Sequence, residues 1–158
     1  LLDRSTRTLF ANGLLLLVTR RGVEPPRMLQ ELTLPRFAII ALANPDLAPY
    51  GAAARRSLQT AGVWQALEER LVYGESVSGA WQLVQSGNAD AAFVAQSVVP
   101  EGAAVGRLVL DPALYPPLRQ AAAVAVASRH PAARDFLDFV RGPEGQAVLR
   151  RHGFAPPQ

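Results

Sequence analysis

Two residue types are missing from this chain of 158 residues, which contains no cysteine and no lysine. Without cysteine it can form no disulfide, no thiolate metal site and no cysteine nucleophile. Histidine is also scarce: His130 and His152 each stand alone near a predicted helix end. Since neither has a second imidazole at ligand spacing, zinc chemistry is excluded and both are interpreted as surface residues.

The chain has 16 basic residues, all of them arginine, and 13 acidic residues, so its net charge is only +3. The arginines are scattered from Arg4 to Arg151, and no aromatic residues interleave them as binding of a single-stranded nucleic acid requires. No nucleic-acid partner is therefore predicted.

Long hydrophobic runs are absent too. The apolar run at residues 14–18, like the others in the chain, is far shorter than the roughly 20 residues that span a bilayer. The chain starts Leu1-Leu2-Asp3-Arg4, without the pattern of a signal peptide, so none is expected within it. A hydrophobic fraction of 49% and a charged fraction of 18% predict a globular chain of one domain, or one and a fraction.

Apolar runs alternate with helical patterns along the chain. Strands are predicted at residues 14–18, 37–42, 71–73, 91–95, 105–110 and 121–127. Helices are predicted at residues 28–32, 52–61, 64–71, 77–85, 131–140 and 143–151. This alternation is typical of the α/β class, with a mixed, mostly parallel sheet flanked by helices and ligands at the carboxyl ends of its strands.

Two turns, residues 44–51 and 73–78, each connect a predicted strand to a helix through small residues. Helix N-termini expose free N–H groups and a partial positive charge, so they bind oxyanions without lysine or arginine. Neither turn is a phosphate-binding P-loop, because the G-x-x-x-x-G-K-[ST] pattern is missing. Ordinary connections between elements remain the alternative interpretation.

The second turn also approaches the nucleophile-elbow pattern G-x-S-x-G, with Ser76 as the serine and Ser78 in place of the last glycine. Asp111 and His130 follow in the chain order of a hydrolase triad. A serine esterase using Ser76 is therefore an alternative function. Against it, the chain is short and no oxyanion-hole glycine cluster precedes the serine, which a helix N-cap also explains.

Five collinear segments, residues 39–51, 71–77, 87–95, 115–120 and 132–154, resemble the periplasmic molybdate-binding proteins of ABC transporters. The resemblance implies a two-lobed, type II periplasmic-binding-protein fold with the oxyanion in the cleft. Compared with that family, the chain lacks the N-terminal part of lobe one and has one complete lobe plus part of a second. Lobe two is expected at residues 15–122, and residues 1–14 and 123–158 would supply the remainder of lobe one, the hinge and the C-terminal helices.

The function that the resemblance implies is capture of molybdate or tungstate in the periplasm for an ABC transporter permease, without cofactor or catalysis. A related protein for another oxyanion or a small acid is the alternative within this class. By motif, Tyr50 and Val77 would bind the anion through their backbone N–H groups. The neighbouring positions expected to support them are Pro49, Gly51, Ser76 and Ser78.

The chain departs from the family pattern at several positions. Some members carry a tyrosine where Ala95 stands, so Tyr50 is expected to take that role, and an acidic residue is often found where Ala121 stands. No serine or threonine in residues 1–13 matches the lobe-one ligands, so the chain alone is expected to bind molybdate weakly or not at all. Exposed apolar surface is expected at residues 14–18 and along the C-terminal helices, which makes a dimer possible.

Overall fold

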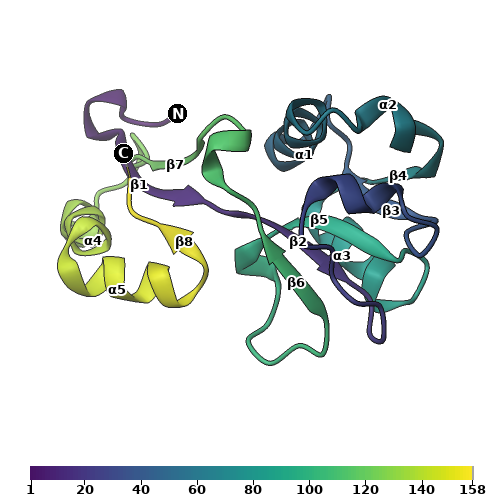
Figure 1. The fold of residues 1–158 in the computed structure, drawn as a ribbon. Coiled ribbons are helices and arrows are strands. Elements are labelled where there is room, and N and C mark those ends of the chain that lie inside the picture. Colours follow the sequence, from purple (N-terminus) through teal and green to yellow (C-terminus); the bar gives the residue numbers. More distant parts are fainter. Residues whose placement is uncertain (158) are drawn as a thin grey trace. The chain divides into compact units, whose positions relative to one another are not determined.

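The computed structural model describes residues 1–157 and consists of two compact units (Figure 1). The larger unit is Leu14–Pro116, and the smaller unit combines Leu1–Gly13 with the residues from Pro117 onward. Each unit has its own sheet. Strand β7, which the predicted segment 15–122 included, belongs to the smaller unit because it pairs with β1 there.

The larger unit is built on a five-stranded sheet with the order β4-β3-β5-β2-β6. Its strands are β2 (Leu15–Thr19), β3 (Ile40–Ala43), β4 (Leu71–Gly74), β5 (Ala91–Ala95) and β6 (Gly106–Val109). Strand β3 runs parallel to β4 and β5, whereas β2 runs antiparallel to β5 and β6. The sheet is mixed, as predicted, but the expectation of a mostly parallel sheet was wrong. Parallel pairing is confined to the two neighbours of β3, and the other two strand pairs are antiparallel.

Helices cover both faces of this sheet, so its strands need apolar residues on both sides. On one face Leu16, Val18 and Val94 pack with Trp81 and Val84 of α3 (Val77–Gln85). Helix α1 (Pro49–Thr60) contacts β2, β3 and β5, and α2 (Trp64–Leu67) contacts α1. Short 3₁₀ turns complete the unit: η2 (Leu29–Thr33), η3 (Glu68–Arg70), η4 (Gln96–Val98) and η5 (Pro112–Leu114).

The smaller unit has a three-stranded antiparallel sheet with the order β7-β1-β8. Its elements are η1 (Arg4–Thr6), β1 (Thr8–Gly13), β7 (Leu118–Ala122), α4 (Ala132–Arg141), α5 (Pro143–Arg151) and β8 (Phe154–Ala155). The side-chain amide of Gln146 donates to the carbonyl oxygens of Phe10 (2.8 Å) and Val140 (3.0 Å). These bonds join α5 to β1 and to the end of α4.

Three further sequence expectations were wrong. The strand expected at residues 121–127 lies at Leu118–Ala122, and the helix expected at 52–61 begins at Pro49, because proline suits the first turn of a helix. Residues 15–18, expected to be exposed, are each at most 1% exposed. They lie in β2, between two strands and under helices. The exposure expected along the C-terminal helices is confirmed at Phe136 (63%) and Phe139 (49%).

Within residues 1–157, every helix is too short or too polar to cross a membrane. The same residues include no group of three or more histidine, aspartate or glutamate side chains placed to hold a metal ion.

Candidate functional site

The first predicted turn brings the start of α1 directly against the end of β3. The turn is fixed by Asn44, whose side-chain oxygen accepts from the Asp46 N–H (2.9 Å) and whose carbonyl accepts from Ala48 (2.9 Å). A Cβ on Gly51 would collide with the carbonyl oxygen of Ala43 and lie 2.8 Å from its carbonyl carbon. Glycine at position 51 therefore allows the first turn of α1 to touch the strand.

The second turn places the start of α3 against the end of β4 in the same way. The Ser76 hydroxyl accepts from the Gly79 N–H (3.1 Å), so Ser76 is the N-cap of α3. A Cβ on Gly74 would lie 2.7 Å from the backbone nitrogen of Ala80. Here too a glycine lets backbone pack on backbone.

The two helix starts lie at the same edge of the sheet. Ala43 and Gly74, the last residues of β3 and β4, are opposite each other in a parallel pair. The Asn44 N–H extends this pairing by donating to the Gly74 carbonyl (3.1 Å). Because the carboxyl ends of parallel strands share one edge, α1 and α3 both begin there.

Backbone donors are left free at this edge. The N–H groups of Tyr50 and Gly51 in α1, and of Val77 and Ser78 in α3, fall in first turns, where a helix offers no acceptor. Within residues 1–157 none of the four donates a hydrogen bond, and no side chain caps α1. Four N–H groups at two positive helix ends make this edge attractive to an anion.

Two tyrosines add hydroxyl groups to the larger unit. Burial raises the pKa of the half-buried Tyr50 to about 12, with a further contribution from Tyr115. Burial also raises the pKa of Tyr115, although the Leu15 N–H, which donates to its hydroxyl (3.1 Å), opposes the shift. Both phenols are therefore protonated at neutral pH and can donate.

Sequence reasoning did not select Tyr115 or Gln96 as site residues. Tyr115 was noted only as part of the segment 115–120. Gln96 follows β5, which runs parallel to β3, so it comes at the same edge as the two helix starts. Its side-chain oxygen is buried and, within residues 1–157, has no hydrogen-bond partner. No local pattern marks either residue.

The three residues of the hydrolase alternative each have a local role. Ser76 caps α3, and the Asp111 carboxylate accepts from the Ala113 N–H (2.9 Å) at the start of η5. Nδ1 of His130 accepts from the Ala132 N–H (3.3 Å) before α4. Serine and aspartate belong to the larger unit and histidine to the smaller. Local capping thus accounts for the pattern that suggested a triad.

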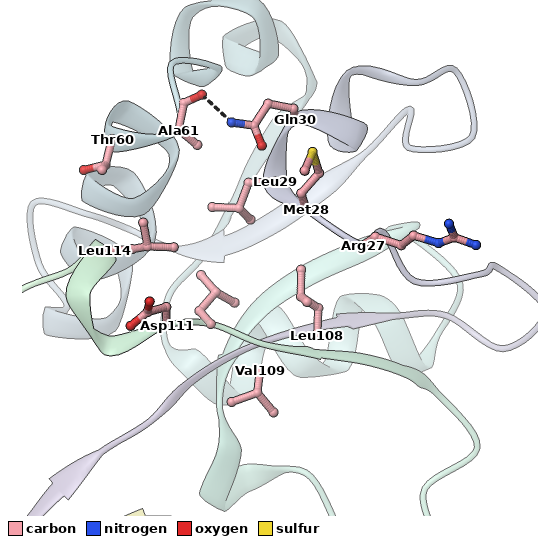
Figure 2. Close-up of a pocket in the computed structure, with 11 residues that line it drawn as sticks. Arg27, Met28, Leu29, Gln30, Thr60, Ala61, Leu108, Val109, Asp111 and Leu114 are labelled. Carbon is pink, nitrogen blue, oxygen red and sulfur yellow. Dashed lines mark hydrogen bonds between the residues drawn. The ribbon is translucent and has the colours of Figure 1, made fainter.

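A cavity of about 350 Å³ also opens in the larger unit (Figure 2). Leu29, Leu108 and Leu114 are among the residues that line it, and the Gln30 amide donates to the Ala61 carbonyl (3.0 Å) at its rim. Thr60 and Ala61 mark the C-terminal end of α1. The cavity is therefore at the opposite end of α1 from Tyr50, and it is separate from the edge with free N–H groups.

Residues 1–155 match a protein family described as bacterial extracellular solute-binding protein. The chain belongs to this family. It is 39% identical over 118 residues to a molybdate-binding protein of Rhodobacter capsulatus, covering 73% of this chain and 46% of the relative. It is also 37% identical over 122 residues to a molybdate-binding protein of Azotobacter vinelandii, and this match covers 75% of this chain and 48% of the relative.

A solved structure of the periplasmic molybdate-binding protein of Azotobacter vinelandii superposes with a TM-score of 0.85 at 28% identity. The match covers 99% of this chain and 71% of that one. The predicted α/β, periplasmic-binding-protein-like fold is thereby confirmed. Membership of a family of solute-binding proteins likewise supports a binding protein rather than an enzyme. The chain spans about half the length of the curated relatives that it matches.

Proposed function

We propose that this chain belongs to a solute-binding protein that captures a tetrahedral oxyanion, molybdate or tungstate, at the edge where α1 and α3 begin. The observation that carries the proposal is the pair of adjacent helix N-termini with four free N–H groups. The names of the relatives supply the identity of the anion.

In this proposal Tyr50 and Val77 donate their backbone N–H groups to the anion, with Gly51 and Ser78 next to them. Pro49 and Ser76 set the helix starts, and the Tyr50 hydroxyl is a further candidate donor to the anion. Neutral donors hold a dianion without a full opposing charge, which lets it leave when the lobes open. Because molybdate has longer metal–oxygen bonds than sulfate has sulfur–oxygen bonds, a wider ring of donors favours it.

Location and partners follow from the same proposal. We expect a periplasmic protein that delivers its anion to an ABC transporter permease. Donors from only one lobe give weak binding, so the chain by itself should hold molybdate far less tightly than a two-lobed protein would. The exposed Phe136 and Phe139 support the proposal that the chain alone can dimerise.

Backbone amide NMR of the full chain, titrated with molybdate up to millimolar concentration, tests the site even if binding is weak. We expect the amides of Tyr50, Gly51, Val77 and Ser78 to shift together. Tungstate should shift the same amides by similar amounts, whereas sulfate and phosphate should cause smaller shifts. Shifts confined to other parts of the chain would contradict the proposed site.

A proline substitution removes one donor with little disturbance. Val77 is the first residue of α3, a position that proline favours, and the extended backbone of Ser76 suits a following proline. Val77→Pro should therefore weaken molybdate binding about tenfold or more. Val77→Ala, the matched control, keeps the N–H group and should change the affinity by less than about threefold. Equal effects of the two variants would show that the side chain, not the N–H, matters.

A further inference from the structure

Positive charge is concentrated in the smaller unit. This unit carries eight of the 16 arginines but only four of the 13 acidic residues, which gives it a net charge of +4. The larger unit, with eight arginines and nine acidic residues, has a net charge of −1. The excess charge of the chain therefore lies outside the unit that contains the proposed molybdate site.

These arginines are also poorly neutralised by ion pairs. In the larger unit three arginines form ion pairs at 2.9–3.0 Å, among them Arg20 with Asp90. Within the described part of the smaller unit, the only ion pair joins Arg134 to Asp3 at 3.6 Å, and the Arg134 side chain is 71% exposed. Arg7 and Arg141 have no carboxylate within 4 Å among residues 1–157.

Three of these arginines line one cavity of about 250 Å³. Ser5, Thr6, Arg7 and Thr8 form one wall, and Arg134, Leu137, Asp138 and Arg141 of α4 form the other. Positions 134, 138 and 141 lie on one face of the helix, because residues four and three apart are neighbours. Arg7 faces that helix side from the segment that joins η1 to β1.

The guanidinium groups are the main donors available in this cavity. The hydroxyls of Ser5 and Thr6 already donate to Asp3, at 2.6 Å to its carboxylate and 2.7 Å to its carbonyl. Only Thr8, whose hydroxyl makes a long 3.5 Å bond to the Leu9 carbonyl, is weakly engaged. Arginine presents paired N–H donors in a planar fork that matches a phosphate group. The Asp138 carboxylate in the same wall opposes an anion.

We propose that this cavity is a second anion site, which binds a phosphate group through Arg7, Arg134 and Arg141. Its chemistry differs from that of the site at α1 and α3, because charged donors replace neutral ones, and the proposal does not depend on the first. A volume of 250 Å³ compares with about 30 Å³ for one water in the liquid, so a phosphate with a few attached atoms fits.

Calorimetric titration of the full chain with inorganic phosphate and with glycerol 3-phosphate tests the site, and sedimentation with phosphatidylcholine vesicles containing phosphatidic acid tests a lipid source. Arg7→Gln and Arg141→Gln should each weaken binding at least fivefold. Asp138→Asn should strengthen it two- to threefold, because it removes the opposing charge. All of these side chains are exposed, so the variants should fold.

Arg119→Gln is the matched control, because Arg119 is an exposed arginine of the same unit outside this cavity. It should change the affinity by less than twofold. Binding of any of the three probes with this variant pattern supports the site and identifies the source of the phosphate. If Arg119→Gln and Arg141→Gln lowered the affinity equally, the binding would come from the general positive charge of the unit, and the proposed site would be wrong. Absence of binding to all three probes would overturn the proposal.

Discussion

The two units differ in how they are held together. Of 30 buried apolar residues among residues 1–157, all but Ala11 and Leu118 lie in the larger unit. Helix α4 of the smaller unit buries none of its residues, and its phenylalanines face solvent. Since burial of apolar surface is the main favourable contribution to folding, the larger unit has its own core and the smaller unit has almost none.

Because of this difference, the two units should differ in how well they tolerate substitutions. The larger unit positions its helix starts through a packed sheet, so disturbances in its core should reach the whole unit. The smaller unit relies on strand pairing and on bonds such as those of Gln146, and many of its side chains should be replaceable with little effect. Substitutions paired across the two units measure how large the difference is.

The largest effect is expected from Phe93→Ala in β5. Phe93 is 1% exposed at the centre of the sheet, and loss of such a side chain leaves a cavity. The free energy of unfolding should fall by about 3–5 kcal/mol. Chemical denaturation monitored by circular dichroism measures this change.

Phe136→Ala in α4 is the counterpart in the smaller unit. Because Phe136 is 63% exposed, its removal should change the free energy of unfolding of the monomer, measured at low protein concentration, by at most about 0.5 kcal/mol. A loss as large as that of Phe93→Ala would show that α4 is covered in solution, as in a dimer. Sedimentation of the wild type would then show the dimer, and Phe136→Ala should weaken it.

Much of the larger unit could be predicted from the sequence because its signals are local. Helix α3 was predicted at residues 77–85 and strand β5 at 91–95, as observed, since a serine cap and apolar spacing mark the helix. Strand β7 was misplaced. The alanine-rich run at residues 121–127 looks like a strand, but pairing with the distant β1 selects Leu118–Ala122 instead.

In the candidate site, too, the features set by local sequence were predictable and those set by long-range contacts were not. Glycines and turn residues predicted the start of α3 and the turn before α1, because those residues act within a few positions of the helix, although α1 itself begins three residues earlier than predicted. Tyr115 could not be predicted, since its hydroxyl meets the N–H of Leu15, which lies 100 residues away in the chain. Long-range contacts of this kind depend on the folded sheet.

Gly51→Ala, at the start of α1, should also lower the free energy of unfolding, by less than Phe93→Ala does. The new methyl group would collide with the backbone of Ala43, so helix and strand must separate. We expect a loss of about 2–3 kcal/mol in the free energy of unfolding. Gly79→Ala in α3 is the control, because its methyl group would meet its nearest neighbour at an ordinary 3.6 Å. Similar losses in both variants would refute the close approach at position 51.

The last contrast is between two aspartates that both form ion pairs with arginine. Asp90 accepts from Arg20 (2.9 Å) and from the N–H groups of Ala38 (2.9 Å) and Ile39 (3.0 Å). Burial alone would raise its pKa, but these hydrogen bonds outweigh burial and hold the pKa below the ordinary 3.8. Asp90→Asn should lower the free energy of unfolding by about 1.5 kcal/mol at neutral pH.

The pH dependence of this loss identifies its cause. A carboxylate whose pKa is lowered by folding stabilises the protein above pH 3.8, and that contribution disappears as the pH falls through the lowered value. The difference between the wild type and Asp90→Asn should therefore shrink in acid. The pKa of Asp3 is lowered mainly by its bonds from Ser5, but the Asp3 side chain is 33% exposed, about twice the 16% of Asp90, and Asp3→Asn should have no resolvable effect at neutral pH. If Asp3→Asn cost as much as Asp90→Asn, the surface ion pairs of the two units would be equivalent, and the contrast between the units would rest on their apolar cores alone.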